Sequence, residues 1–145
     1  MSRLVCLVLC SVVLVGCDTT TTQPLERVWQ GQLEGEPGWE HLSGETAVHF
    51  VEGTASFIAA AQIAGDEPGE IRPWHVHFNT CAEGGGIVGE DGDYPRLVVD
   101  TDGTAVASAT VPQSVEPGAD YHVNVHLSEA EMGTIIMCAD LELVF

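Results

Sequence analysis

The feature that most constrains this fold is a succession of short strand-forming runs separated by turn residues. The runs are rich in β-branched and aromatic side chains, and Gly, Pro and acidic residues separate them. No run keeps a helical period of apolar residues. The pattern covers eight runs: residues 27–33, 46–51, 55–63, 71–78, 96–99, 104–111, 121–127 and 134–145. The chain is therefore predicted to be all-β, an antiparallel sandwich or flattened barrel of about eight strands.

Two runs predict local detail. Pro73 lies inside the run 71–78 and has no amide proton for a strand ladder, so this run is expected at a sheet edge or with an irregular start. The turn sequence Asp-Thr-Asp-Gly at residues 100–103 joins the runs 96–99 and 104–111. These two runs are therefore expected to form a β-hairpin.

The first residues have the composition of an export signal rather than of the folded domain. Arg3 precedes an almost wholly apolar stretch over residues 4–15, which predicts a secretory signal peptide over residues 1–16. The closing Leu-Val-Gly-Cys resembles a bacterial lipobox, which implies lipidation of Cys17; the alternative is an ordinary signal peptide with an incidental cysteine. The polar, Thr-rich residues 17–25 then form a flexible tether to a domain over residues 26–145.

These segments predict an exported lipoprotein. It would be anchored to the cell envelope of a bacterium, in the periplasm or on the outer surface, and would contact the membrane only through its lipid. The charge agrees with that limit: once Arg3 has left with the signal peptide, three arginines face 22 acidic residues, a net charge of −19. Nucleic-acid binding is excluded because phosphate contacts need clustered cations. Anionic membrane surfaces are unfavourable partners for the same reason.

Cysteine usage points to an oxidising compartment. Cys6 and Cys10 leave with the signal peptide and Cys17 carries lipid, so Cys81 and Cys138 remain. Outside the cytosol, one disulfide is favoured over two buried free thiols. A zinc site built on this pair would need further ligands at close spacing, and the sequence has none there.

Histidines alternate along two of the predicted strands. His75 and His77 leave one face of the run 71–78, whereas the other face is expected to fill the core with Trp74, Val76 and Phe78. In the run 121–127, one face carries His122, Asn124 and His126. A sheet that joins these strands would gather three or four imidazoles, which are ligands for copper or zinc rather than calcium or magnesium. The alternative is a set of polar residues on an exposed strand face.

The order of several motifs resembles the copper/zinc superoxide dismutase family over residues 44–145. The resemblance rests on Trp-His-Val-His-Phe at residues 74–78, Cys81, the glycines at 84–86, residues 93–105, Val125-His126 and residues 136–139. It implies a Greek-key β-barrel and a Cys81–Cys138 disulfide that ties the active-site loop to the last strand. It also implies His75, His77 and His126 as ligands of one copper ion. His122 shares a strand face with His126, which makes it a candidate fourth nitrogen or proton donor.

The chain departs from that family at the positions that matter for zinc and catalysis. Residues 86–88, Gly-Ile-Val, stand where the histidine that bridges copper and zinc is due. Asp93 matches the zinc aspartate, but the zinc histidines are missing and Glu90 does not replace them. Ile135 stands where the arginine that guides superoxide is due, and the acidic electrostatic loop is reduced to residues 128–133. We therefore expect no zinc site of the family type.

Three functions follow as hypotheses. The first is a copper-only, superoxide dismutase-like enzyme, whose turnover the charge of −19 and the missing arginine oppose. The second is a protein of the same fold that binds copper without turnover. The third is a structural lipoprotein, which a similarity of residues 121–126 to the chordin-type domain favours. No catalytic residue beyond the ligands is assigned, and the sequence leaves the oligomeric state open.

Overall fold

The computed structural model describes residues 25–145. The expected signal peptide, the lipidated Cys17 and all but the last residue of the expected tether lie outside the described residues. Residues 25–145 contain no helix with the length and apolar character needed to cross a membrane.

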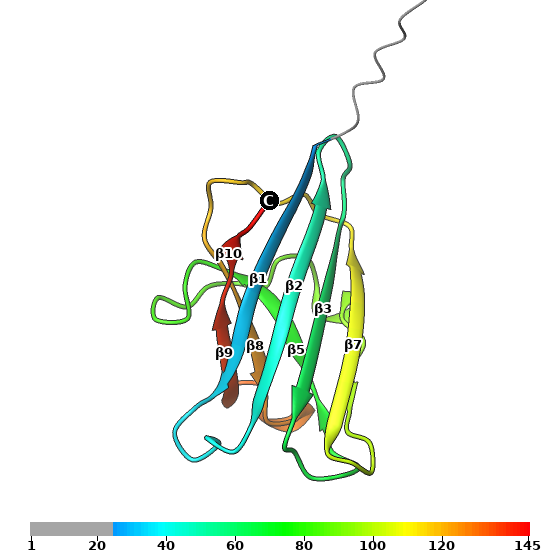
Figure 1. The fold of residues 1–145 in the computed structure, drawn as a ribbon, viewed down its shortest axis with the longest axis vertical. Helices are drawn as coiled ribbons and strands as arrows, with labels where there is room; N and C mark the ends of the chain where they lie inside the picture. Colours follow the sequence, from blue (N-terminus) through cyan, green and yellow to red (C-terminus); the bar gives the residue numbers. More distant parts are fainter. Residues whose placement is uncertain (1–24) are drawn as a thin grey trace, which may run out of the picture.

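Seven strands form one curled antiparallel sheet in the spatial order β5-β8-β9-β1-β2-β3-β7 (Figure 1). Its strands are β1 Glu26–Gly35, β2 Ser43–Val51, β3 Phe57–Ala64, β5 Trp74–Phe78, β7 Thr104–Val111, β8 Tyr121–His126 and β9 Ile135–Asp140. The short β10, Glu142–Leu143, pairs with β1. Strands β3 and β7, and β5 and β8, are neighbours in space although other strands separate them in the chain. This arrangement confirms the prediction of an all-β, antiparallel barrel or sandwich.

The alternation of side chains along each strand places the core inside the curl. On β7, residues 105, 107, 109 and 111 are buried and the residues between them are exposed. The Ala-rich β3 forms despite its low strand propensity because β2 and β7 pair with it on either side. Strand propensity is largely a measure of such packing, so the neighbours decide. The largest core side chains include Trp29, Leu33, Phe57 and Trp74.

Two expectations about the strands need correction. Pro73 splits the run 71–78 into β4, Ile71–Arg72, and β5, which lies at the edge of the large sheet as predicted. The turn at residues 100–103 forms, but β6, Leu97–Val98, pairs with β4 and not with β7. The predicted hairpin was therefore wrong, because a distant strand supplies the partner for β6.

A third correction concerns the core. Phe78, the last residue of β5, is 37% exposed instead of filling the core. Trp74 and Val76 on the same face are fully buried, as expected.

Candidate metal centre

The pairing of β5 with β8 brings the predicted histidines together. The antiparallel register sets His75 opposite Asn124 and His77 opposite His122, and it places His126 at the end of β8 beside His75. The valines on the other face of both strands are fully buried in the core. A slip of one residue in this register would turn the histidines into the core, so core packing fixes the histidine face.

Three of these histidines form a group that could hold one metal ion. The ligand nitrogens of His75, His77 and His126 all lie within 4.8 Å of one another. Nδ1 of His75 and Nε2 of His126 are 3.2 Å apart. At metal–nitrogen distances of about 2.0–2.1 Å, that separation corresponds to an angle of about 100° at a shared ion. Such an angle suits a four-coordinate centre.

Hydrogen bonds on the far side of two rings orient them towards this centre. Nε2 of His75 lies 2.7 Å from Oδ1 of Asp91, and Nδ1 of His77 lies 3.0 Å from the carbonyl oxygen of Gly85. Each acceptor requires a proton on the nitrogen it faces, which leaves Nδ1 of His75 and Nε2 of His77 as lone-pair donors. Metal-binding histidines in proteins are commonly held in this way by a carboxylate or a backbone carbonyl.

Buried polar atoms without partners also point to a missing ligand. Among the described residues, Nε2 of His77, Nδ1 of His126 and Oδ1 of Asn124 are buried and have no hydrogen-bond partner. An unpaired buried polar group is costly, and such groups are rare in native proteins. A metal ion bound to Nε2 of His77 would remove this cost for one of the three atoms. The residues present therefore fit a metal ion.

Burial keeps the three imidazoles neutral. His75, His77 and His126 are 0%, 7% and 5% exposed. Burial lowers the pKa of all three, to about 4 for His77, and the hydrogen bond to Asp91 partly offsets this for His75. A neutral imidazole is the form that binds metal. The group is thus ready to accept a cation at pH 7 without first losing protons.

The candidate fourth histidine, His122, lies beside this group rather than inside it. Its ring stacks on that of His77, with centroids 5.1 Å apart and planes 19° apart. Its Nδ1 lies 2.9 Å from the carbonyl oxygen of Asn79, which adopts a left-handed backbone conformation with φ 67°. The geometry gives His122 a packing contact with a candidate ligand.

The loop after β5 covers the histidine face and explains why that face is buried. The amide of Phe78 donates to Gly86 and the amide of Val88 donates to Val76, so residues 86–88 extend the edge of β5. An added Cβ at Gly85 would lie 2.1 Å from the carbonyl oxygen of Phe78, and only glycine fits there. The segment where a bridging histidine was due thus closes the edge of the strand.

The other positions at which the sequence departs from the superoxide dismutase pattern contribute no ligand to the three-histidine group. Glu90 and Asp93 form a reciprocal capping box on the short 3₁₀ turn η1, Asp91–Asp93. Neither belongs to the three-histidine group. Ile135 is the partly exposed first residue of β9.

Sequence reasoning missed Asp91 and Arg96. Asp91 contacts His75, and Arg96 binds both carboxylate oxygens of Asp91 and also Glu129 of the 3₁₀ turn η2, Glu129–Glu131. The signal that could have pointed to Arg96 is scarcity. The chain has four cationic side chains against 22 acidic ones, so each arginine has many candidate partners.

Two further links tie the loops at the site to the sheet. Cys81 and Cys138 form the expected disulfide, with Cα atoms 6.2 Å apart, which joins the loop after His77 to β9. Arg72 is buried against Asp66, which it binds through Nε at 2.7 Å, and its Nη1 donates to the carbonyl oxygen of Leu127 at 2.6 Å. Arg72 thereby fixes the chain immediately after His126.

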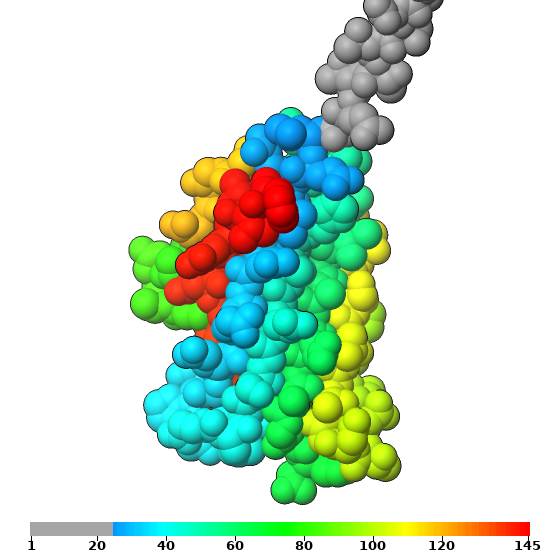
Figure 2. Space-filling view, viewed as in Figure 1, coloured from blue at the N-terminus to red at the C-terminus, as the bar shows by residue number. Residues whose placement is uncertain are grey.

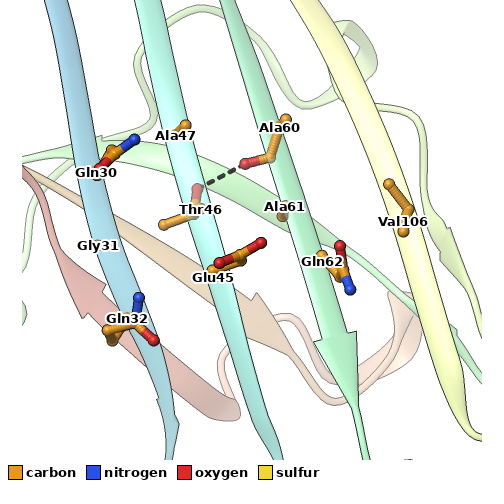
Figure 3. A pocket seen from close by; sticks show the side chains of 10 residues that line it. All are labelled: Gln30, Gly31, Gln32, Glu45, Thr46, Ala47, Ala60, Ala61, Gln62 and Val106. Carbon is orange, nitrogen blue, oxygen red and sulfur yellow. Dashed lines mark hydrogen bonds between the residues drawn. The ribbon is translucent and has the colours of Figure 1, made fainter.

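A separate hollow lies on the outer face of β1, β2 and β3 (Figure 3), on the side of the molecule that faces the viewer in Figure 2. Its volume is about 240 Å³, and polar side chains of Gln30, Gln32, Glu45 and Gln62 surround small residues at its centre. Within its lining, the hydroxyl of Thr46 donates to the carbonyl oxygen of Ala60 at 2.8 Å. Glu45 is the one titratable side chain in its lining, which contains no histidine or cysteine.

No protein-family model matches this chain, and no curated protein matches it. Its function must therefore be inferred from the site itself.

Proposed function

We propose that this protein binds one copper ion through Nδ1 of His75, Nε2 of His77 and Nε2 of His126. The observation that carries the proposal is the convergence of three neutral, buried imidazoles. The far nitrogen of His75 contacts the carboxylate of Asp91, and the far nitrogen of His77 contacts the carbonyl oxygen of Gly85. Asp91, the carboxylate that contacts this group, faces the far nitrogen of His75 and not the centre. The donor set is therefore all nitrogen.

An all-imidazole set favours copper among the common divalent metals. Imidazole suits both copper and zinc, but the affinity of a given site for divalent metals peaks at Cu²⁺. Calcium and magnesium need several oxygen ligands, whereas the three-histidine group supplies imidazole nitrogens. All three candidate ligands are buried.

Superoxide dismutation is the second candidate function. It is favoured by the resemblance of the ligand motifs to copper/zinc superoxide dismutases, and by the donor count, because three ligands leave a coordination position open. Bound copper would supply the one-electron exchange by which two superoxide ions and two protons give dioxygen and hydrogen peroxide. Arg96, which binds Asp91 beside the histidines, is paired with two carboxylates and does not present a free positive charge to an anion.

The export and lipid anchor expected from residues 1–25 are part of the same proposal. An extracytoplasmic setting agrees with the Cys81–Cys138 disulfide, since disulfides persist in oxidising compartments. Mass spectrometry of the protein purified from a bacterial membrane fraction would reveal a diacylglycerol on Cys17. An unmodified N-terminus would remove the lipoprotein claim.

Copper titration with a dismutation assay on the same samples tests the functional proposal. We expect one tight Cu²⁺ per chain that a fifty-fold excess of zinc does not displace. The variants His75→Ala and His126→Ala should lose that binding, whereas the surface variant His41→Ala should keep it. Dismutation above that of the metal-free protein would establish the second candidate, and tight binding without turnover would establish a copper-binding protein. Failure of the wild-type protein to bind copper would refute the proposal.

A further inference from the structure

A clamp of three charged side chains crosses the loops above the histidine site. We define the Arg96 clamp as Arg96 with Asp91 and Glu129. Nη2 of Arg96 lies 3.0 and 2.9 Å from the two carboxylate oxygens of Asp91 and 3.1 Å from Oε2 of Glu129, and its Nε binds Oε1 of Glu129. Asp91 opens η1 and Glu129 opens η2, so one guanidinium joins the two loops that follow the two histidine-bearing strands.

We propose that Arg96 is a positioning residue for the metal site, acting through Asp91 on His75. This inference rests on the proposed copper site. Among residues 25–145, Asp91 is the only side chain that hydrogen-bonds to Nε2 of His75, and it lies on a three-residue turn with its own side chain 50% exposed. An exposed carboxylate that is not held would turn to water and leave Nε2 of His75 without its acceptor. By binding both oxygens, Arg96 keeps Asp91 on His75 and so keeps Nδ1 of His75 turned to the metal.

A further hydrogen bond holds the guanidinium of Arg96 beside His75. Its Nη1 donates to the carbonyl oxygen of Tyr94, and the ring of Tyr94 packs edge-on against His75, with centroids 5.2 Å apart. Tyr94 is buried and its hydroxyl donates to the carbonyl oxygen of Val88 at 2.6 Å. Arg96 is therefore hydrogen-bonded to Tyr94, a buried residue that packs against His75.

At its other end the clamp binds η2, which begins three residues after His126. Glu129 follows His126 by three residues, and the amide of Leu127 between them donates to Thr134 across the base of this loop. Arg96 holds Glu129 with two of its nitrogens. One guanidinium thus joins the turn of Asp91 to the loop that follows His126, and its effect on a candidate ligand runs through Asp91. Removing it should affect the metal site more than the fold, because surface ion pairs add little to stability.

The matched control is the exposed pair of Arg27 with Glu52. Arg27 binds Glu52 through Nε at 3.2 Å and Nη2 at 2.9 Å, and it lies on β1, which does not carry a candidate ligand. The variants Arg96→Gln and Arg27→Gln therefore remove the same charge and the same kind of ion pair. Of the two variants, only Arg96→Gln removes a contact to Asp91.

The first arm of the test uses metal-free protein and long-range ¹H–¹⁵N NMR of the imidazole rings. In the wild-type protein and in Arg27→Gln, His75 should be the tautomer protonated on Nε2. In Arg96→Gln the signals of His75 should shift towards a mixture of tautomers. An Arg96→Gln spectrum in which His75 is unchanged would overturn the inference, whatever the protein does with copper.

The second arm is a double-mutant cycle on copper affinity. Losing an outer contact to a metal ligand typically lowers affinity about 10- to 100-fold, so Arg96→Gln should bind copper about 10-fold more weakly than Arg27→Gln. Because Arg96 acts through Asp91, the double variant Asp91→Ala/Arg96→Gln should be no weaker than Asp91→Ala alone. Independent, additive losses would contradict the mechanism. Absence of copper binding by the wild-type protein would refute the proposed function instead, and the NMR arm would still decide the role of Arg96.

Discussion

Acidification of the metal-free protein should destabilise it through His77. The pKa of His77 falls from 6.5 to about 4 on folding because the side chain is buried, so the unfolded chain binds the proton more readily. The stability that neutral His77 contributes is therefore fully present above pH 6.5, and it is lost as the pH falls towards 4. At about 1.4 kcal/mol for each pKa unit, His77 alone should reduce the free energy of unfolding by about 3 kcal/mol over this range.

The variant His77→Asn isolates this effect. Its amide can still donate to the carbonyl oxygen of Gly85, which His77 binds at 3.0 Å, but it does not titrate. Urea unfolding of both proteins in EDTA at pH 7 and pH 4 gives the difference in free energy of unfolding at each pH. Groups that titrate in both proteins cancel in that difference. The variant should gain about 3 kcal/mol relative to wild type at pH 4. A difference that does not change with pH would refute the assignment of a neutral, buried His77.

Two other predictions concern the loop after β5. The variant Cys81→Ala removes the disulfide between residues 57 positions apart. Loop-closure entropy predicts that the free energy of unfolding, measured in urea, falls by about 4 kcal/mol. A variant as stable as wild type would show that this disulfide does not constrain the unfolded chain. Gly85→Ala places a Cβ 2.1 Å from the carbonyl oxygen of Phe78 and must displace the acceptor of His77, whereas Gly86→Ala meets nothing within 4 Å. Copper affinity should fall about 10-fold in the first variant and stay unchanged in the second; equal affinities would contradict a positioning role for Gly85.

The strands and the shared face of each histidine pair were predictable from the sequence because both depend on local alternation, whereas the group of His75, His77 and His126 was expected from the resemblance to a family. His75 and His77 must share a face wherever their strand lies, and so must His122 and His126. The core-forming valines between them fix which face that is. The sequence pattern did not reveal which strands pair, and for this reason the hairpin of residues 96–99 with 104–111 was wrong.

The surroundings of the histidines depend on contacts between segments far apart in the chain. Asp91 reaches His75 across 16 residues and Arg96 reaches Glu129 across 33. Neither contact leaves a periodic pattern in the sequence. The burial of the histidine face has the same origin, since irregular loops cover a face that alternation alone would leave exposed.

The central claim is that three imidazoles bind one copper ion, and electron paramagnetic resonance of the Cu²⁺-loaded protein tests it most directly. Labelling histidine with ¹⁵N should change the hyperfine structure in the manner of three coupled nitrogens. The variants His75→Ala, His77→Ala and His126→Ala should each alter that spectrum, whereas His41→Ala should not. A spectrum that histidine labelling does not change, or that survives all three substitutions, would contradict the account.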